Sequence, residues 1–596
     1  MSVHLRSTVR RALLLANRTG NGSIAITGQR AALGNASAMG SAAASPNPKP
    51  SIRTNVYENN IVTSPYADCE FHDMTLTQKF FESAVRWPDK IALECGISGR
   101  RYTYNTMSQA VCRFGSALTR MGFIQGEVMG IIAPNLPEFP IAMFGAAGAG
   151  MPVALVNPTY TADEIARQMT LVEATCLFGV SEMAETLKAV AQLCPTVRRI
   201  VLLGPSQDGC VSYQDMMQDS GDLFNDNIKI DIDNDIFILP HSSGTSGLPK
   251  NVMLTHSTVG KNVQQYLHPE GTNNRPATDT HQETYIGFLP FFHSYGMVGL
   301  MLSAVESGAK LVTLPRFDVP SFLKAIDDHQ PTYLHLVPPL VSLLTNLPEL
   351  KAQSYSRVHT IFCGAAPLGA PLAIKLLERF THPVSFQEAY GLTEMSPGVM
   401  MGPLGNKKLG SCGSLLSRTQ AKIVDLETGQ RTLGPHEDGE LYVFGPQAMK
   451  GYYKNQQATD EMIGADGWLR TGDIGHYDED GHFFIVDRLK ELIKVNGFQV
   501  APAELEEVLT THPAIKEAAV IGIPDERVGE LPRAYVVKKP GMESVGECDI
   551  NAFVNAKVSA YKQIKGGIQF CDSVPRSNIG KILRRELRVQ YANSCK

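Results

Sequence analysis

The chain has 596 residues, of which 43% are hydrophobic and 19% are charged. This composition is that of a globular protein, and the length exceeds what one hydrophobic core supports, so we expect at least two domains. The formal net charge of −5 excludes bulk attraction to nucleic acid, so any phosphate that the protein binds needs a local site.

The cysteines and the apolar runs exclude two further classes. Eleven cysteines are scattered from Cys69 to Cys595 without a CxxC pair, which argues against a disulfide framework or structural zinc and fits a reducing compartment. The longest nearly apolar run, 141–156, contains Pro152 and is shorter than the ~20 residues of a spanning helix. We expect a core helix and a buried strand there, and no transmembrane segment.

The N-terminus differs from the rest of the chain. No acidic residue precedes Glu58, and Ser and Ala are abundant. The basic residues of this stretch are Arg6, Arg10, Arg11, Arg18, Arg30, Lys49 and Arg53. The pattern predicts a mitochondrial transit peptide and linker over 1–55, ending near the proline-rich stretch 45–50. The alternative is a disordered tail on a cytoplasmic protein.

After residue 55, strand-like and helix-like patterns alternate. The apolar run 128–133 predicts a strand, which is followed by a helix through Phe144 and a second strand at 152–156. The next helix is expected to open at Thr161, because Thr161 and Glu164 have the spacing of a capping box. Such alternation predicts an α/β fold with parallel sheets covered by helices.

From about Gly439 the strands become shorter and turns more frequent. The stretch 491–500 contains an Asn-Gly pair between two strand-like runs, which predicts a hairpin. A helix is expected from Pro502, because proline suits the first turn. Two strands, at 517–523 and 534–538, and a helix at 550–560 complete the pattern. We therefore predict domains at 56–486 and 487–596, the second of them α+β.

One loop carries the composition of a phosphate site. Residues 241–250 read HSSGTSGLPK, directly after an apolar strand at 236–239. Small residues let backbone amides and hydroxyls surround phosphate oxygens, and Lys250 adds a positive charge. The loop is not a Walker motif, because Asn251 stands where Ser or Thr would hold magnesium. Taken alone, it could equally be a Ser/Gly-rich surface loop.

Further motifs follow in a fixed order. They are FFHSY at 291–295, CGAAP at 363–367, EAYGLTE at 388–394, WLRTGD at 468–473, DRLK at 487–490 and PRSNIGK at 575–581. With the loop, they resemble the adenylate-forming superfamily, and within it the acyl- and aryl-CoA ligases such as 4-coumarate:CoA ligase and luciferase-like enzymes. The resemblance spans about 75–587. It implies a large domain of helix-covered sheets with a small β-barrel-like part, and a small mobile α+β C-terminal domain.

The resemblance implies residues for ATP. The nucleotide would be bound by Ser242, Ser243, Gly244, Thr245, Ser246, Gly247, Lys250, Gly364, Ala365, Ala366, Glu388, Ala389, Tyr390, Gly391, Thr393, Asp473, Arg488 and Lys581. Tyr390 would stack on adenine, Thr393 would contact the α-phosphate, and Asp473 would accept both ribose hydroxyls. Glu394 would hold Mg²⁺ together with phosphate oxygens.

The resemblance also implies catalytic and hinge residues. Lys581 would bridge the attacking carboxylate and the α-phosphate, Lys250 would bind phosphate, and His293 would lie beside the reacting carboxylate. Lys490 takes the hinge position. Outside this context a lone histidine is more often a core residue, and a lysine in a tail helix is normally solvated.

The acid pocket would be lined by His293, Tyr295, Gly296, Gly391, Met395 and Pro397. A hydroxycinnamate-like aromatic acid and a medium- or long-chain fatty acid, which would place the protein in lipid metabolism, both remain open. Three positions depart from the family pattern: Asn251 replaces a glycine, Ile579 replaces a small polar residue, and the pair at 495–496 replaces an aromatic–lysine pair near coenzyme A. The adenylation step is therefore better supported than the acceptor.

The predicted reaction has two steps: an acid and ATP form an acyl-adenylate with release of pyrophosphate, and coenzyme A then takes the acyl group with release of AMP. The partners are these small molecules and no nucleic acid, and the oligomeric state stays open. The alternatives are an enzyme that loads a carrier protein, a luciferase-like oxygenase and a non-enzymatic binding protein. The last would be favoured if Lys581, Asp473 or Glu394 were missing, and all three are present.

Overall fold

The computed structural model describes residues 58–224, 228–242, 250–347, 352–489, 491–495, 498–525, 527–558, 560–576 and 580–594. The described residues belong to one compact unit, Asn55–Lys596. Three predictions lie outside the described residues: the leader at 1–55, the loop residues 243–249, and the hinge residue Lys490.

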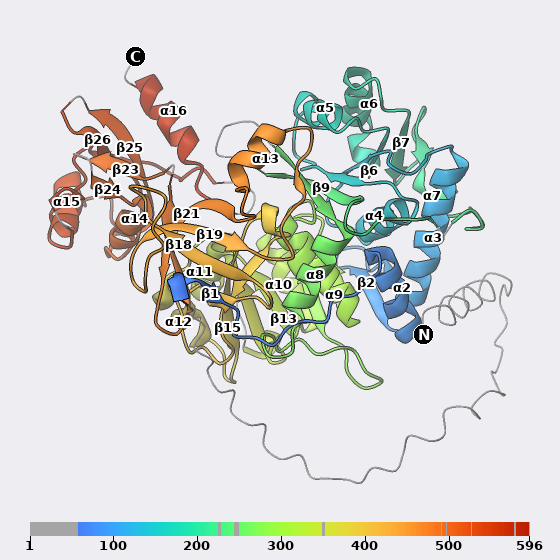
Figure 1. The fold of residues 1–596 in the computed structure, drawn as a ribbon, viewed down its shortest axis with the longest axis horizontal. Coiled ribbons are helices and arrows are strands. Elements are labelled where there is room, and N and C mark those ends of the chain that lie inside the picture. Colours follow the sequence, from blue (N-terminus) through green and yellow to red (C-terminus); the bar gives the residue numbers. More distant parts are fainter. Residues whose placement is uncertain are drawn as a thin grey trace, which may run out of the picture. The chain divides into compact units, whose positions relative to one another are not determined.

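One sheet has eight strands, in the order β20-β10-β9-β5-β4-β6-β7-β8. Its strands β6, β7 and β9 are labelled in Figure 1. Its strands are β4 (Met129–Ile132), β5 (Val153–Leu155), β6 (Cys176–Val180), β7 (Arg199–Leu203), β8 (Val211–Ser212), β9 (Ile236–Ser242), β10 (Lys250–Thr255) and β20 (Gly451–Tyr452). The strands from β9 to β8 are parallel, whereas β10 runs antiparallel to both β9 and β20.

A nine-stranded sheet has the order β17-β16-β15-β14-β13-β11-β12-β2-β3. Its strands are β2 (Ile91–Cys95), β3 (Arg101–Thr103), β11 (Thr284–Gly287), β12 (Lys310–Thr313), β13 (Tyr333–Leu336), β14 (Thr360–Cys363), β15 (Ser385–Gly391), β16 (Gly398–Met401) and β17 (Ser414–Leu415). The strands from β15 to β2 are parallel, and the remaining pairs are antiparallel. The predicted parallel sheets are thus confirmed.

Helices cover both faces of the first sheet, because its short parallel strands are apolar throughout. One face joins the second sheet in a large core that also contains α2 (Leu76–Arg86), α3 (Tyr104–Arg120), α4 (Glu138–Gly148), α8 (His256–Tyr266), α9 (Ser303–Ser307), α10 (Val319–His329), α11 (Pro338–Asn346) and α12 (Ala370–Leu377). The other face packs on α5 (Ala162–Leu171) and α6 (Ala184–Leu193). The predicted capping box is present: the amide of Glu164 donates to Thr161 Oγ1 at 3.3 Å, and the amide of Thr161 donates to Glu164 Oε2 at 2.8 Å.

The small all-β part is a five-stranded antiparallel sheet with the order β1-β18-β19-β21-β22. Its strands are β1 (Val62–Thr63), β18 (Gln420–Val424), β19 (Gly439–Phe444), β21 (Leu469–Tyr477) and β22 (Phe483–Arg488), and α13 (Gln456–Met462) lies between β20 and β21 in the chain. Short helical segments lie in the connections between the strands and longer helices: η1 (Glu58–Asn60), η2 (Ser181–Met183), α7 (Tyr213–Met216), η3 (Tyr295–Leu302), η4 (Ala352–Tyr355) and η5 (Thr393–Met395).

The C-terminal part, orange to red in Figure 1, is α+β as predicted. It contains β23 (Ile493–Val495), β24 (Phe498–Val500), α14 (Pro502–Thr510), β25 (Ile515–Asp525), β26 (Gly529–Lys538), α15 (Glu547–Asn555), β27 (Ile568–Phe570) and α16 (Arg584–Ser594). Val495 pairs with Phe498 in the expected hairpin, and a proline opens α14. The sheet has its own apolar core, with Ile493, Leu505 and Val520 at its centre.

None of the described helices is both long and apolar enough to cross a bilayer. None of the ten cysteines that lie in described residues forms a disulfide.

Candidate functional site

The strands that flank the phosphate loop are held in register. β9 and β10 are antiparallel neighbours, and Ser242 at the end of β9 pairs with Lys250 at the start of β10. The loop 243–249 lies outside the described residues, so only its two ends are placed. The Lys250 ammonium lies 4.8 Å from the ring centroid of Tyr452, within the range of a cation–π contact.

The predicted adenine-binding segments lie at the ends of neighbouring parallel strands. Cys363, the last residue of β14, pairs with Glu388 of β15, so 364–366 leave the sheet beside 389–391, the last residues of β15, which pair with β16. Ala365 adopts a left-handed backbone with φ of 75°. The Glu388 carboxylate accepts a hydrogen bond from the Gly410 amide at 2.7 Å, and burial raises the pKa of Glu388 to about 7. Glu388 therefore supports the strand end.

Asp473 connects the predicted adenine and ribose residues. The Tyr390 hydroxyl donates to its Oδ2 at 2.7 Å, and Arg488 Nε lies 3.1 Å from its Oδ1. The register explains this geometry, because Asp473 of β21 and Arg488 of β22 are paired residues in the five-stranded sheet. The structure thus brings Tyr390, Asp473 and Arg488 together from distant parts of the chain.

Lys581 lies among charged residues of the site. Burial, followed by the positive charge of Arg488, lowers the pKa of Lys581 to about 8, whereas the carboxylates of Glu491 and Asp473 oppose that shift. Burial and the charge of Lys581 also lower the pKa of His293 to about 4, so its imidazole is neutral at physiological pH. His293 Nδ1 accepts a hydrogen bond from the Tyr295 amide at 3.3 Å.

Glu394 and Thr393 lie on η5, beside two residues that the sequence did not single out. The Tyr452 hydroxyl donates to Glu394 Oε1 at 2.7 Å, and the hydroxyls of Thr393 and Ser294 lie 3.4 Å apart. Glu394 is 7% exposed, and within the described residues its Oε2 accepts no hydrogen bond. A buried carboxylate with one uncommitted oxygen suits a hard cation such as Mg²⁺.

The residues predicted to line the acid pocket have different surroundings. The Tyr295 hydroxyl donates to the carbonyl of Phe362 at 3.0 Å, which pins the ring against the end of β14. At Gly391 a Cβ atom would lie 2.2 Å from the Pro397 carbonyl oxygen, so only glycine fits. Met395 is fully buried in the core of the five-stranded sheet. Their part in acid binding stays a prediction.

A small cavity of about 10 Å³, room for about one water molecule, lies next to Tyr295 and was not anticipated from the sequence. It is lined mainly by aromatic rings, with Gly299 and a few polar groups; the lining includes Tyr266, Asn274, Tyr285, Tyr333, His335 and Phe362. The Tyr295 ring packs against those of His335 and Phe362, with centroids 5.8 Å and 6.0 Å away. No periodicity or motif marks this cavity, because its walls come from five separate segments of the chain.

Two polar side chains at this cavity have no hydrogen-bond partner among the described residues. They are His335, at both ring nitrogens, and Asn274, at Oδ1. Burial lowers the pKa of His335 to about 3, so the ring is neutral, with one donor and one acceptor nitrogen. Unpaired buried polar groups are costly, so a ligand that bonds to them would gain affinity.

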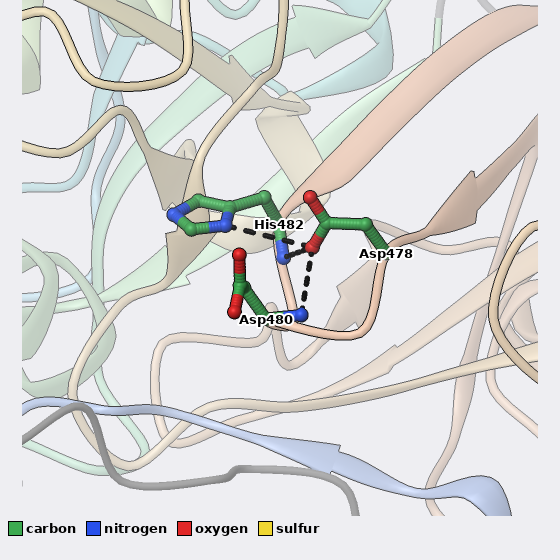
Figure 2. A group of neighbouring side chains, drawn as sticks. All are labelled: Asp478, Asp480 and His482. Atoms are coloured by element: carbon green, nitrogen blue, oxygen red, sulfur yellow. Dashed lines mark hydrogen bonds and ion pairs between the residues drawn. The ribbon is translucent and has the colours of Figure 1, made fainter.

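Among the described residues, a separate group of three possible metal ligands lies at the turn after β21 (Figure 2). The oxygens of Asp478 are already used: they accept from the amides of Asp480 and His482 at 3.1 Å and 2.9 Å, and Lys408 lies 2.8 Å away. Lys408 also pairs with Asp480 at 3.3 Å. These bonds describe a closed turn with an ion pair rather than a cation site.

Two parts of the chain match known families. Residues 80–453 match the AMP-binding enzyme family, and residues 504–581 match the AMP-binding enzyme C-terminal domain. The second match ends at Lys581. All the large-domain site residues from Ser242 to Glu394 fall within the first match.

Curated relatives cover most of the chain. A protein of Dictyostelium discoideum named probable 4-coumarate–CoA ligase 3 is 37% identical over 516 residues, which cover 84% of this chain and 92% of the relative. A protein of Oryza sativa subsp. japonica named 4-coumarate–CoA ligase 3 is 36% identical, over 87% of this chain and 93% of the relative.

Solved structures share the fold. ATP-bound MatB from Rhodopseudomonas palustris is 26% identical and superposes with a TM-score of 0.79, covering 88% of this chain and all of that one. The anthranilate CoA ligase AuaEII in complex with anthranoyl-AMP has the same TM-score at 24% identity. The chain therefore belongs to the AMP-binding enzyme family and groups there with the AMP-forming acid–CoA ligases.

Proposed function

We propose that this protein joins a carboxylic acid to coenzyme A at the cost of ATP, through an acyl-adenylate held between Lys250, Lys581 and Asp473. The observation that carries the assignment of residues is the position of Lys581. Burial and then the charge of Lys581 lower the pKa of His293, which supports a shared site for this lysine of the C-terminal part and the predicted acid-binding histidine.

In the first step, an oxygen of the substrate carboxylate attacks the α-phosphorus of ATP, and the bond to pyrophosphate breaks. Such transfers depend on positioning and on neutralisation of the developing negative charge. Lys250 and Lys581 supply positive charge. The imidazole of His293 is neutral, so it can donate a hydrogen bond to the reacting carboxylate without adding a further positive charge. Mg²⁺ held by Glu394 would add charge neutralisation at the phosphates.

In the second step, the sulfur of coenzyme A attacks the activated carbonyl, the thiol loses its proton, and AMP leaves. Lys581 fills part of the site in the first step, so we expect the C-terminal part to rotate about residue 490 before the thiol enters. This division assigns Lys581 to adenylation and leaves thioester formation to another face of the same domain.

We propose that the acid is aromatic and carries a polar group at the end remote from its carboxylate, as hydroxycinnamates do. Support comes from His335, which borders a small cavity beside Tyr295 and has both ring nitrogens unpaired among the described residues. A ring hydroxyl that reached these nitrogens would pair with them, whereas a fatty-acid tail offers them no partner. The names of the curated relatives point to the same class.

The reaction is tested by measuring pyrophosphate release and thioester formation with Mg²⁺, ATP and a panel of acids. We expect a hydroxycinnamate to give both products, and Lys581→Ala to lower adenylation on the order of 10²-fold or more, because one preorganised cation is lost. Thioester formation from supplied acyl-adenylate should change much less. Failure of the wild-type protein to form any acyl-adenylate would overturn the proposal, and an equal loss in both steps would overturn the assigned rotation.

The lowered pKa of Lys581 predicts an unusual pH dependence. A lysine is cationic below its pKa, so Lys581 should lose its charge as the pH rises through about 8, whereas an exposed lysine would keep it to beyond pH 10. Since kcat/KM reports the free enzyme, kcat/KM of adenylation for ATP should fall above pH 8. The matched variant Lys581→Arg stays charged, so its profile should be flat from pH 7.5 to 9.5 even if its rate is lower. The same fall in both proteins would assign the titration to another group.

Substrate choice should depend on His335. His335→Leu removes both ring nitrogens from the cavity, so kcat/KM for an acid with a ring hydroxyl should fall roughly ten-fold, the cost of one lost buried hydrogen bond. The same acid without its hydroxyl serves as the internal control and should be used equally well by both proteins. A parallel loss with both acids would mean that His335 only shapes the fold, and unchanged selectivity would exclude it from the acid site.

We also propose that residues 1–55 direct the protein to mitochondria, because this stretch is basic, lacks acidic residues and is rich in Ser and Ala. Fused to a fluorescent reporter, it should localise the reporter to mitochondria and be shortened on import. Replacing Arg10 and Arg11 by Glu should leave the reporter in the cytosol. Cytosolic, full-length reporter from the unaltered segment would exclude this address.

A further inference from the structure

The two-residue strand β20 fixes Tyr452 beside the phosphate-loop strands. Tyr452 pairs with Val252 of β10, two residues after Lys250. Backbone bonds lock this register on both sides: the amide of Lys450 donates to Met253 at 3.0 Å, and the amide of Tyr453 donates to Asn251 at 2.8 Å. The Tyr452 amide itself donates to Thr459 Oγ1 at 2.9 Å, which ties β20 to α13.

The side chain of Tyr452 then meets two site residues at once. Its hydroxyl donates to Glu394 Oε1 at 2.7 Å, and its ring lies 4.8 Å from the Lys250 ammonium.

The same segment also holds the backbone of the metal-binding turn. The amide of Met449 donates to the Glu394 carbonyl at 2.8 Å. Residues 449–452 therefore fasten both the backbone and the carboxylate of Glu394 to the strand that begins with Lys250. With Oε1 committed to Tyr452, Oε2 is the carboxylate oxygen left for a cation.

We propose that Tyr452 is a positioning residue for the metal–nucleotide complex: its hydroxyl orients the Glu394 carboxylate, and its ring places the Lys250 ammonium, so that cation and lysine meet the same phosphates. The inference rests on the proposed function, since it assigns Glu394 to the metal. A carboxylate with a fixed rotamer loses less freedom when it binds a cation, so the gain appears as metal affinity.

The test is metal binding without turnover. Mn²⁺, as a paramagnetic substitute for Mg²⁺, is titrated into the full chain with a non-hydrolysable ATP analogue and followed by EPR. Tyr452→Phe keeps the ring under Lys250 and removes only the hydroxyl, so we expect three- to ten-fold weaker Mn²⁺ binding with little change in the affinity for the metal-free analogue. Tyr452→Leu also removes the ring and should weaken binding of the analogue itself.

Tyr477→Phe is the matched control, because Tyr477 is also buried and, among the described residues, its hydroxyl donates to the Leu433 carbonyl at 3.2 Å and not to Glu394. It should leave Mn²⁺ affinity unchanged. Equal Mn²⁺ affinity in Tyr452→Phe and wild type would overturn the inference while the proposed function stands. Absence of analogue-dependent Mn²⁺ binding in the wild type would instead remove the metal role on which the inference rests.

Discussion

The ion pair between Asp473 and Arg488 connects the separate parts of the site. It joins paired residues of β21 and β22, so the sheet register sets its geometry. Asp473 also accepts the Tyr390 hydroxyl at the end of β15, and the Arg488 charge reaches Lys581 in the C-terminal part. A shift of Asp473 would therefore move the carboxylate predicted to bind ribose, remove the hydrogen-bond partner of Tyr390, and change the electrostatic potential at Lys581. The five-stranded sheet is thus the frame of the nucleotide site.

The three cations of the predicted site differ in their surroundings, and these surroundings determine how strongly each positive charge is stabilised. Lys250 rests on an aromatic face, and Arg488 is paired with a carboxylate. Lys581 instead bears the cost of burial next to another cation, which is why its pKa is lowered. The negative charge of a bound nucleotide would stabilise the buried ammonium of Lys581. Nucleotide binding and the buried position of Lys581 seen here should therefore favour each other. In the proposed mechanism, this coupling would weaken once pyrophosphate has left, which would favour the proposed rotation of the C-terminal part.

Local signals predicted the elements, and contacts between distant segments limited the prediction of the site. The capping box at Thr161, the hairpin at 491–500 and the helix at Pro502 could be read from neighbouring residues, and all three are confirmed. Most of the predicted site residues were assigned through the family resemblance of the motifs and not from local chemistry. Tyr452 escaped notice because β20 has two residues and no periodicity, and its role depends on a pairing with β10 about 200 positions earlier in the chain. His335 was not predicted as a site residue, because a single histidine in an apolar strand is typical of a core position.

The proposed hinge at residue 490 requires that the residues beyond it move as one body. Arg584, at the start of α16, forms ion pairs with Glu491, directly after the hinge position, and with Glu506 of α14, the latter at 2.7 Å. Since the guanidinium is largely buried, these pairs lose little to solvent screening and hold α14 and α16 against the first residue of the rotating part. Lys581 lies three residues before Arg584. In the proposed rotation at residue 490, Lys581 would therefore move together with α14 and α16, and this movement would withdraw its charge from the site.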